Sequence, residues 1–591
     1  MRWVIREADP ASVHALSDSL DVSPLLARLL ALRGVGDPAS ARRFLSPALG
    51  HLHDPFHMLS MDTAVRRIHQ AVANREKILI YGDYDVDGAM AVVVLDAALK
   101  LVGAQAHHHI PHRMREGYGM RTEVVEQARA DGVSVLISVD TGIRAFAVVE
   151  RARELGLDCI ITDHHLPEAE HPADAVSGSV RIPRALAVLN PKQPGCAYPD
   201  KNLCGAGVAF KLAQALLASC PATAPRLSRL LPSFLKLVCI GTIADSVPLV
   251  GENRVIARLG LDGLRLPVNP GLKALIEAAG LDPGAPEPIT SWDVGFRLAP
   301  RLNAAGRMES AQDVIDLFTR AGPAEAQELA LKLNRLNTDR QAAEQGILAE
   351  IEERIERQPQ EFSGPCLVVE GEGWHRGVIG IVASRLVDRF HRPALVISVE
   401  DGTGHGSGRS IEQFHLLDAL TTCEDILDRF GGHRLAVGFG LPADRIADLR
   451  ARMNQVATRC LTQDDFIPDL ELDGEIALSD LSPETVQELD RLAPHGYGNP
   501  RPVFGCRTVR LQGRPRLLKQ RHLKMQVAQG SCVFTALGWR KGPPWIDRLE
   551  QLERLSGLGA AFDVAFCLTQ NSFQGESRTE LELTDLNVPL T

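Results

Sequence analysis

Residues 78–90 read ILIYGDYDVDGAM and place three aspartates, Asp83, Asp85 and Asp87, at alternate positions directly after an apolar run. Carboxylates this close repel one another, and each raises the cost of ionising the next unless a cation neutralises them. A single D-x-D pattern is also common in turns and helix caps. Whether positive charge holds these aspartates together therefore depends on what the rest of the chain brings to them.

A strand–helix alternation begins at this stretch. The apolar runs ILIY, VSVLISVD, DCIITD and ALAVLN are short and rich in β-branched residues, and helical patterns such as AMAVVVLDAALKLVG separate them. Wholly apolar strands that alternate with helices indicate a parallel sheet covered on both faces. Ligands of such sheets bind beyond the carboxyl ends of the strands, and the first three strands end there in acidic residues or a histidine pair.

The remaining sequence indicates further domains, because 591 residues exceed what one core accommodates. In the segment 322–361, Ile347, Ile351 and Ile355 recur every four residues, which is typical of an amphipathic connector helix. The last segment has short alternating strands with Gly- and Pro-rich turns, which indicate a small β-barrel. We expect a helical N-terminal segment over 1–50, the parallel-sheet domain over 51–321, connector helices over 322–361, a smaller α/β domain over 362–460 and the barrel over 461–591.

Composition narrows the class of protein. With 45% hydrophobic and 23% charged residues the chain is ordinarily globular, and its net charge of -10 argues against non-specific nucleic-acid binding as its whole role. Eleven cysteines without a C-x-x-C pair indicate free thiols in a reducing compartment. The N-terminus has no apolar signal core, and no run approaches the ~20 apolar residues of a membrane span. We therefore expect a cytoplasmic protein with no membrane association.

Four segments supply candidate metal ligands. GDYDVDG carries three carboxylates, SVDTGI carries Asp140, ITDHH carries Asp163, His164 and His165, and GTIADSVPL carries Asp245. Oxygen ligands with only one or two imidazoles suit Mg²⁺ or Mn²⁺ better than zinc. Two such cations activate water and clamp both oxygens of a phosphoryl displacement. A doubled histidine alone is usually a surface or core feature, but four such elements in order favour a metal site.

The ordered set GDYDVDG, VDTGI, TDHH and GTIADSVPL resembles the four metal motifs of the DHH phosphoesterase superfamily. Seven further segments resemble RecJ-type single-stranded-DNA-specific exonucleases over nearly the whole chain: PHRMREGYGM, AVLNPK, LCGAGVAFKL, APRLNAAGRM, GWHRGVIGIVASRL, GSGRS and GGHRLAVGF. The implied fold is multidomain α/β. It comprises a parallel-sheet DHH domain, a long helical connector, a smaller α/β DHH-associated domain and a C-terminal OB-like β-barrel, which PHGYGNPRPVF would enter.

The resemblance implies a role for each matched residue. Asp83 and Asp163 would support the metal ligands, and His165 would contact the scissile phosphate or assist its proton transfers. Many superfamily members have a histidine four residues before the first D-x-D aspartate, where this chain has Tyr81. RecJ-type enzymes often lack that histidine, so the change favours this subgroup over pyrophosphatases and leaves the first metal one nitrogen ligand short. The residues that would bind two Mn²⁺ or Mg²⁺ ions, with Asp140 as the bridge, are Asp85, Asp87, Asp140, His164 and Asp245.

Candidate phosphate-binding residues lie in segments that we expect to be loops. These are Arg113 in PHRMREGYG and Arg301, Asn303 and Arg307 in APRLNAAGR, and guanidinium forks bind phosphate oxygens in pairs. Each arginine alone would be an ordinary surface residue, and in the resembled family these segments hold substrate phosphates.

The glycine-rich GHGSGRS suggests a backbone anion nest, although such a loop alone could be a plain turn. It offers Gly406, Ser407, Gly408 and Arg409, and GGHR offers His433. The triple histidine at 107–109 lies in an expected strand, and we interpret it as structural.

The C-terminal domain segregates its charge. No acidic residue lies between Asp490 and Asp547. On a small barrel such a surface is typical of single-strand binding, in which the phosphate backbone gives affinity and aromatic rings stack bases; a merely solvated basic face is the alternative. Tyr497, Phe504, Phe534 and Trp539 are candidates for stacking, and we expect at least half of them in the core. The basic residues of this interval are Arg491, Arg501, Arg507, Arg510, Arg514, Arg516, Lys519, Arg521, Lys524, Arg540 and Lys541.

We therefore predict a processive exonuclease that degrades single-stranded DNA from its 5′ end to 5′-mononucleotides in recombination and repair. The polarity and the preference for DNA are implied by the resemblance, as are a RecQ-type helicase, single-strand-binding protein and mismatch-repair proteins as partners. We expect a monomer. One alternative is a phosphoesterase for very short oligonucleotides, cyclic dinucleotides or pyrophosphate, which would need neither the basic domain nor this length. The other is a non-catalytic replication scaffold, which predicts broken metal motifs, whereas every motif here is intact.

Overall fold

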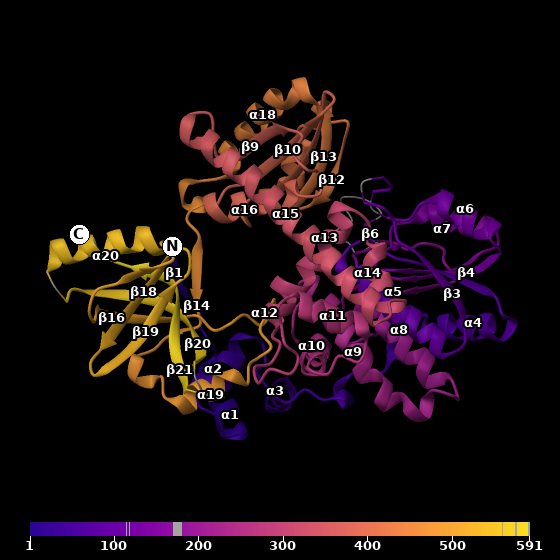
Figure 1. Ribbon diagram of the computed structural model, residues 1–591, viewed down its shortest axis with the longest axis horizontal. Coiled ribbons are helices and arrows are strands. Elements are labelled where there is room, and N and C mark those ends of the chain that lie inside the picture. The colour runs from indigo at the N-terminus through magenta and orange to yellow at the C-terminus, as the bar shows by residue number, and fades with distance from the viewer. Residues whose placement is uncertain (114, 118, 170–179, 558, 574–575, 589–591) are drawn as a thin grey trace. The chain divides into compact units, whose positions relative to one another are not determined.

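The computed structural model describes residues 1–113, 115–117, 119–169, 180–557, 559–573 and 576–588. The chain forms two compact units (Figure 1). Unit 1 comprises residues 1–52, 248–258 and 469–591, and unit 2 comprises residues 53–247 and 259–468. Residues 1–50, which we expect as a separate N-terminal segment, share one unit with the C-terminal domain.

Unit 2 begins with a five-stranded parallel sheet in the order β3-β2-β4-β5-β8. The strands β2, β4, β5 and β8 are largely apolar and buried because both faces of the sheet are covered there, whereas the edge strand β3 reads QAHHH and is only partly buried. On one face Leu79, Leu136 and Ile161 pack against the helices α6 and α7. In chain order the strands are β2 (Lys77–Tyr81), β3 (Gln105–His109), β4 (Val133–Val139), β5 (Asp158–Thr162) and β8 (Ala187–Leu189); the short pair β6 (Glu168–Ala169) and β7 (Val180–Arg181) lies outside the sheet.

Helices surround this sheet and continue beyond it. The helix α5 is buried over most of its length and packs against α8 and α9. The bounds are α4 (Met61–Asn74), α5 (Val86–Leu101), α6 (Thr122–Ala130), α7 (Phe146–Glu154), α8 (Gly205–Ser219), α9 (Leu227–Ala244), α10 (Gly251–Leu264), α11 (Pro270–Ala278), α12 (Ser291–Asp293), α13 (Ala299–Met308) and α14 (Gln312–Thr319). A single π-helical turn, Val294–Leu298, joins α12 to α13.

One helix among the described residues is long and apolar enough to cross a membrane by length and composition alone. It spans Ala224–Ala244, and 44% of its apolar window is buried inside the structure. The expectation that no run approaches this length is therefore wrong. A core helix meets the same test, and α9 is apolar because it packs against α5 and α8.

The second α/β region of unit 2 is a five-stranded sheet in the order β12-β13-β11-β10-β9, in which only β9 and β10 are parallel. The long helix α15 (Pro323–Arg357) leads into it as one continuous element and buries Ile347 and Ile351 against one face of the sheet. The other elements are β9 (Leu367–Glu372), α16 (Ile379–Phe390), β10 (Ala394–Glu400), β11 (Thr403–Arg409), α17 (Leu416–Thr421), β12 (Arg429–His433), β13 (Ala436–Pro442) and α18 (Ile446–Cys460).

Unit 1 contains a closed barrel. Its sheet runs β15-β16-β20-β21-β19-β18-β17, and β16 also pairs with β18, which closes the ring. The helices α1 to α3 join the barrel through β1, which pairs in parallel with β14. The bounds are β1 (Arg2–Ile5), α1 (Pro10–Leu20), α2 (Pro24–Leu32), α3 (Pro38–Leu45), β14 (Asp469–Leu472), β15 (Gly474–Glu475), α19 (Pro483–Asp490), β16 (Phe504–Leu511), β17 (Arg516–Leu518), β18 (His522–Gln529), β19 (Cys532–Gly538), α20 (Gly542–Ser556), β20 (Ala561–Phe573) and β21 (Glu576–Asn587).

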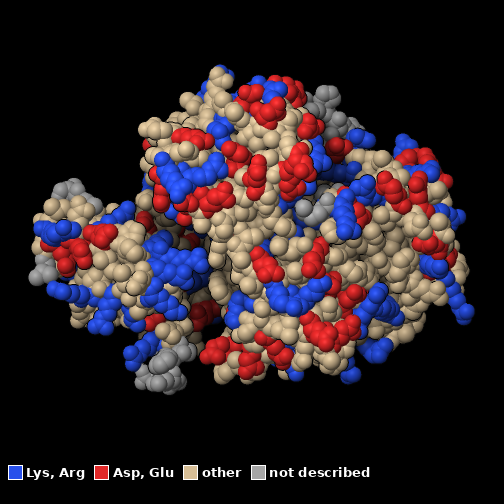
Figure 2. All heavy atoms as spheres, turned by 45° about the horizontal axis from the view of Figure 1, so that its top comes forward, with Lys and Arg blue, Asp and Glu red and all other residues tan. Residues whose placement is uncertain are grey.

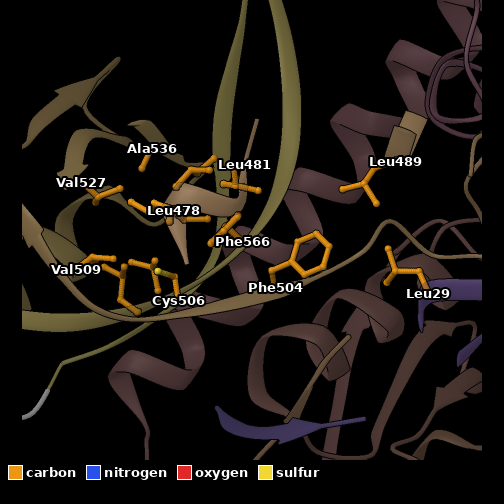
Figure 3. Close-up of a cluster of buried hydrophobic side chains, with 14 of the residues drawn as sticks. Leu29, Leu478, Leu481, Leu489, Phe504, Cys506, Val509, Val527, Ala536 and Phe566 are labelled. Carbon is orange, nitrogen blue, oxygen red and sulfur yellow. The ribbon is translucent and has the colours of Figure 1, made fainter. Parts of the chain in front are cut away.

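One hydrophobic core serves both ends of the chain in unit 1. Leu29 of α2 is fully buried with Leu489 of α19 and Phe504 and Phe566 of the barrel (Figure 3). Phe504 therefore belongs to the core and cannot stack a base, whereas Tyr497 and Trp539 are 67% and 48% exposed. The fourth aromatic candidate, Phe534, is partly buried against the same core.

Because the core is shared, shortening Leu29 should loosen the barrel as well as the N-terminal helices. Leu29→Ala removes a fully buried side chain, and we expect a loss of roughly 2–5 kcal/mol in the unfolding free energy of unit 1. Hydrogen exchange followed by mass spectrometry should show faster exchange in β16 and β20. Leu331→Ala, at a side chain 59% exposed on α15, is the control. Faster exchange confined to α1–α3 would contradict the shared core.

Candidate metal centre

Three neighbouring strands of the parallel sheet end in acidic residues. Asp83 follows β2, Asp140 follows β4 and Asp163 follows β5, and these strands lie side by side in the sheet. Their side chains are 4%, 2% and 1% exposed. The structure thus brings together carboxylates that lie far apart in the chain, at the edge where parallel sheets bind ligands.

The turn from β2 into α5 positions the D-x-D aspartates. Asp85 is the N-cap of α5 and accepts a hydrogen bond from the Gly88 N–H at 3.0 Å. Asp87, one residue into the helix, accepts hydrogen bonds from the backbone N–H groups of Gly205 at 2.6 Å and Ala206 at 2.9 Å. These two groups are the unpaired donors at the start of α8, where a helix stabilises negative charge. The N-terminus of α8 therefore fixes both oxygens of Asp87.

Two glycines allow this close approach. A Cβ at Gly205 would lie 2.5 Å from the Cβ of Asp140, and a Cβ at Gly241 would lie 2.7 Å from Oδ1 of Asp87. Both distances are shorter than non-bonded atoms tolerate. Neither glycine is among the predicted site residues, although LCGAGVAFKL and GTIADSVPL both carry the family resemblance and the second also carries Asp245.

Asp140 has a backbone conformation that side chains rarely adopt. Its φ is 60°, in the left-handed region, which costs a non-glycine residue of the order of 1–3 kcal/mol. Its N–H donates to the Thr162 carbonyl at 3.0 Å and so anchors the residue to β5. The strained turn directs the Asp140 carboxylate toward His164, and Oδ1 lies 3.2 Å from Nε2 of that histidine.

The Asp163–His164–His165 segment adds two imidazoles with different environments. Asp163 accepts hydrogen bonds from the N–H groups of Ile143, His164 and His165, and its Oδ1 lies 2.7 Å from Nδ1 of the His165 ring. Nε2 of His164 faces Asp140, Asp245 at 3.7 Å and Asp87 at 3.9 Å. His164 thus lies among the carboxylates, while His165 is held by Asp163.

The donor set fits hard divalent cations. Three groups of side chains each have ligand atoms within 4.8 Å of one another: Asp83, Asp85 and Asp140; Asp87, His164 and Asp245; Asp140, His164 and His165. Within the described residues, Oδ1 of Asp83, Oδ1 of Asp140 and Nδ1 of His164 are buried with no hydrogen-bond partner. Buried polar atoms without partners are costly, and carboxylate-rich sites with one or two imidazoles suit Mn²⁺ or Mg²⁺. Asp140 and His164 each belong to two of these groups.

Burial and mutual repulsion raise the pKa of the clustered carboxyl groups. Burial and then Asp85 raise the pKa of Asp83 to about 7, and burial, Asp87 and Asp85 raise the pKa of Asp245 to about 8. Burial is also the main cause that raises the pKa of Asp87 and of Asp140. Bound cations would relieve this repulsion.

The two histidines shift in opposite directions. Burial lowers the pKa of His164 to about 4, so the ring is neutral at pH 7, which is the form that binds metals. Burial also opposes the charged form of His165, but its hydrogen bond to Asp163 and the charge of that carboxylate raise the pKa overall.

Basic side chains line the same cavity as the carboxylates. The cavity has a volume of about 300 Å³, and Asp83, Asp85, Asp87 and Asp245 share its wall with Tyr84, Arg113, Asn303 and Arg307. Arg113 lies in a loop as expected, with its guanidinium 5.1 Å from the centre of the Tyr84 ring; residues 114 and 118 of its motif lie outside the described residues. Carboxylates and guanidinium groups thus face one space.

The expectation of a loop over APRLNAAGR is wrong, because this segment forms the helix α13. Asn303 accepts a hydrogen bond from the Val86 N–H at 3.3 Å, and Arg307 donates to the Gly377 carbonyl at 3.1 Å. Arg301 does not line the cavity: it donates to Oδ1 of Asn334 at 3.0 Å and to the Arg297 carbonyl. The helix therefore directs Asn303 and Arg307 into the cavity and Arg301 toward α15.

The glycine-rich GHGSGRS is likewise not a loop. Residues 403–409 form β11, with Gly406 paired to Ile397 and Phe439, and His433 ends β12. Glycine is needed at 406 because a Cβ there would meet the Phe439 ring. The segment therefore offers side chains rather than a backbone nest: a Cβ at Gly380 would lie 3.0 Å from Oγ of Ser407 and 3.3 Å from Nη2 of Arg409, which places these side chains together at the start of α16.

Four arginines from different segments lie near one another: Arg113, Arg307, Arg340 and Arg409. Burial, followed by Arg113, Arg340 and Arg409, lowers the pKa of Arg307 to about 10. Burial and then Arg113 also lower the pKa of Arg409. These shifts report positive charges that lie near one another, an arrangement that favours a bound anion. His433 is less central, and burial, Arg144 and His165 lower its pKa.

Two further residues lie at the site but are not among the predicted site residues. Lys192, in the quoted AVLNPK segment, has a pKa lowered by burial, while Asp245 and Asp163 oppose that shift, so its ammonium lies near the carboxylates. Tyr84 lines the cavity and carries Arg113 on its ring. Tyr81, at the position of the missing histidine, is fully buried in the sheet core, and its hydroxyl donates to the Gly119 carbonyl at 3.4 Å.

Comparisons with known proteins identify the same regions. Residues 77–242 match the model of the DHH family N-terminal domain, residues 363–459 match the DHHA1 domain and residues 472–585 match the RecJ OB domain. The chain is 42% identical to a single-stranded-DNA-specific exonuclease RecJ of Bacillus subtilis, over 92% of this chain and 66% of the relative. It is 36% identical to the protein of that name in Salmonella typhimurium, over 86% of this chain and 87% of the relative.

A solved structure resembles the whole chain. RecJ from Thermus thermophilus in complex with Mn²⁺ aligns with 100% of this chain and 80% of that one, with a TM-score of 0.80 and 29% sequence identity. The same protein has also been solved with Mg²⁺. The multidomain α/β architecture with a C-terminal OB barrel is thereby confirmed.

Metal binding should be linked to pH. Asp83 and Asp245 have folded pKa values of about 7 and about 8, above the ~3.9 of an unfolded aspartate. The folded, metal-free protein therefore binds more protons than the unfolded chain in this pH range. Its stability falls as the pH rises from the unfolded pKa toward the folded pKa values. Metal ions displace those protons, so the gap in Tm between excess Mn²⁺ and EDTA should widen from about pH 5 to about pH 8. Thermal unfolding across this range measures the gap, and a gap that does not depend on pH would contradict the assignment.

Gly205→Ala should damage the metal site without unfolding the protein. The added Cβ meets the Asp140 carboxylate, so we expect at least tenfold weaker Mn²⁺ binding by calorimetry, as for other disturbances of the groups that support metal ligands. Gly346→Ala is the matched control, because a Cβ there meets nothing within 4 Å. Equal Mn²⁺ affinity in the two variants would show that the contact between Gly205 and Asp140 does not position the ligands.

Proposed function

Because this chain belongs to the RecJ family of single-stranded-DNA-specific exonucleases, we propose that it hydrolyses single-stranded DNA processively from the 5′ end, releasing 5′-mononucleotides with the help of two divalent cations. The observation that carries this proposal is the shared cavity in which buried carboxylates face Arg113 and Arg307. Carboxylates suit cations and guanidinium groups suit phosphate. A phosphodiester held between them would be in contact with both.

The carboxylate cluster would hold Mn²⁺ or Mg²⁺ through Asp85, Asp87, Asp140, His164 and Asp245. When bound, such cations supply Lewis-acid polarisation of the phosphate and a lowered pKa for water. The protein contributes the fixed geometry, since the N-terminus of α8 holds Asp87 and a strained turn holds Asp140. Asp83, which lies next to Gly88, would support these metal ligands.

His165 would contact the scissile phosphate. Its Nδ1 lies 2.7 Å from Oδ1 of Asp163, which fixes the orientation of the ring and favours the charged form, because the pKa of His165 is raised. Nε2 is then the nitrogen that would donate to a phosphate oxygen or pass a proton to the leaving group. Asp163 plays the part of the orienting carboxylate in this pair.

Arg113, Arg307 and Arg409 would hold a phosphate group of the strand end, together with Ser407 and Asn303. Their mutual proximity raises the cost of leaving them without an anion. His433 is a further candidate on β12. The contacts of Arg301 favour a structural role in holding α13 against α15, although it was expected to bind substrate.

The barrel would guide the strand. Figure 2 shows Lys and Arg side chains gathered on the surface of unit 1. Some of the predicted basic residues are neutralised, since Arg501 pairs with Glu582 and Arg507 with Glu475 and Asp563. Six of the predicted basic residues lie exposed on and beside β17–β19: Arg514, Arg516, Lys519, Arg521, Lys524 and Arg540. They would bind the phosphate backbone in a salt-dependent manner.

Two other functions are less consistent with these features. A phosphoesterase for short oligonucleotides would have no use for the exposed basic residues of the barrel. A non-catalytic scaffold would have no need of buried carboxylates without partners. Action on DNA in recombination and repair, a cytoplasmic location, a monomeric state and partners such as a RecQ-type helicase, single-strand-binding protein and mismatch-repair proteins belong to the same proposal and rest on the family alone.

Digestion of end-labelled strands tests the proposal. With Mn²⁺, the protein should release mononucleotide at once from 5′-labelled single-stranded DNA and leave duplex intact. Asp140→Ala should lower the rate by roughly a thousandfold, since metal ions supply several kcal/mol of transition-state stabilisation. Asp339→Ala, an exposed carboxylate on α15, is the control. Immediate release from a 3′ label, or hydrolysis of dinucleotides alone, would overturn the polarity or the substrate class.

A further inference from the structure

An exposed aromatic pair lies on the same run of helix as Asn303 and Arg307. Trp292 and Phe296 are 60% and 67% exposed, and their rings stack with centres 5.4 Å apart and an interplanar angle of 28°. Large aromatic rings are seldom left in water. We propose that Trp292 and Phe296 form a stacking platform for an unpaired nucleobase of the strand whose phosphate occupies the cavity, a proposal that rests on the proposed function.

The turn that carries the platform packs against the end of α9. Gly295 faces Ile243, and a Cβ at Gly295 would lie 3.8 Å from Cγ2 of that residue. Ile243 precedes Asp245 by two residues at the end of α9, and Ala244 and Asp245 both line the cavity. The turn between the two aromatic residues therefore packs against the segment that presents a metal ligand.

The spacing along the helix sets the position of the base. Phe296 precedes Asn303 by seven residues, which corresponds to about 10 Å along a helix axis. At ~3.4 Å per stacked nucleotide this distance is roughly three nucleotides. The base that stacks on the platform would therefore lie within the first few nucleotides from the scissile phosphate.

The local structure holds the platform rigid. Thr290 and Asp293 form a reciprocal cap at the start of α12, and a single π-helical turn follows at Val294–Leu298. Arg297, next to Phe296, is tied to Asp293 at 3.1 Å and to the carbonyls of Ala279 and Gly280. A rigid pair of rings loses little conformational entropy when a base binds. π-Helical turns also occur frequently at functional sites.

The occupant that these features favour is a base rather than an apolar peptide. The cavity lined by Asn303 and Arg307 of the same helical run is polar and charged, with guanidinium and carboxylate groups in its wall, so a ligand that extends from it toward the platform must combine anionic groups with flat rings. Single-stranded nucleic acid has this chemistry. Stacking on aromatic side chains tolerates any base, which suits an enzyme that degrades strands of every sequence.

An abasic scan tests the platform directly. In the Asp140→Ala background, which leaves the strand uncut, we would measure by fluorescence anisotropy the binding of short single strands that carry one abasic site at successive positions. One position near the 5′ end should bind about tenfold more weakly than the intact strand. In the Trp292→Ala/Phe296→Ala double variant the intact strand should bind about tenfold more weakly, and that abasic site should have no further effect.

A matched control and a spectroscopic signal complete the test. Leu266→Ala, at a side chain 76% exposed in the same unit, should bind intact and abasic strands as the parent does. Strand binding should quench tryptophan emission, and Trp292→Phe should remove that part of the quenching. An abasic profile that is the same with and without the platform, or quenching of equal size in the parent and in Trp292→Phe, would overturn the inference.

Failure of the inference is distinguishable from failure of the proposed function. A parent protein that cuts and binds single strands but whose abasic profile ignores the platform disproves only the platform. A parent protein that neither cuts nor binds single strands disproves the proposed function, and the platform with it. With the active protein, hydrolysis of dinucleotides should be unchanged in the double variant, while KM for longer strands should rise about tenfold.

Discussion

The repulsion among buried carboxylates at one edge of a sheet is the constraint on which the rest of unit 2 depends. Asp83, Asp87 and Asp140 are almost completely removed from water, and several kcal/mol separate such a charge from its hydrated state unless it is paired. The protein offsets part of this cost by directing the N-terminus of α8 at Asp87. The remaining repulsion is what makes the site selective for cations.

Two glycines and one strained backbone conformation lie at the clustered carboxylates. Gly205 and Gly241 leave no side chain between the carboxylates and the helices that support them. Asp140 adopts a left-handed backbone conformation, which the surrounding sheet must over-determine for it to persist. Substrate-binding elements are added from outside the sheet, because α13 and β11 bring Arg307 and Arg409 near Arg113. A cavity lined by both carboxylates and guanidinium groups results, and helices and strands supply more of these groups than loops do.

Unit 1 depends on a different principle, the sharing of one core by distant parts of the chain. The helices α1 to α3 bury their apolar side chains against α19 and the barrel. The segment 248–258 is bonded to both ends of the chain through Arg254. The buried guanidinium of this residue donates to the carbonyls of Phe44, Arg491, Ala493 and Pro494. Carbonyl oxygens rather than a carboxylate satisfy this charge, and its pKa falls to about 9, first because of burial.

The sequence by itself determined the parallel sheet, the long helix and the ligand types, because these depend on local patterns. Short apolar runs that end in aspartate give β2, β4 and β5, and Ile347 and Ile351 fall on one face of α15 by their spacing alone. Tertiary structure decided which glycine-flanked segments became regular. APRLNAAGR forms a helix because α15 and the Val86 turn give it partners, and GHGSGRS forms a strand because Ile397 and Phe439 flank it. Tertiary structure also decided which arginine of this helix faces the cavity. Arg301 and Arg307 have the same side chain, but packing gives them different neighbours.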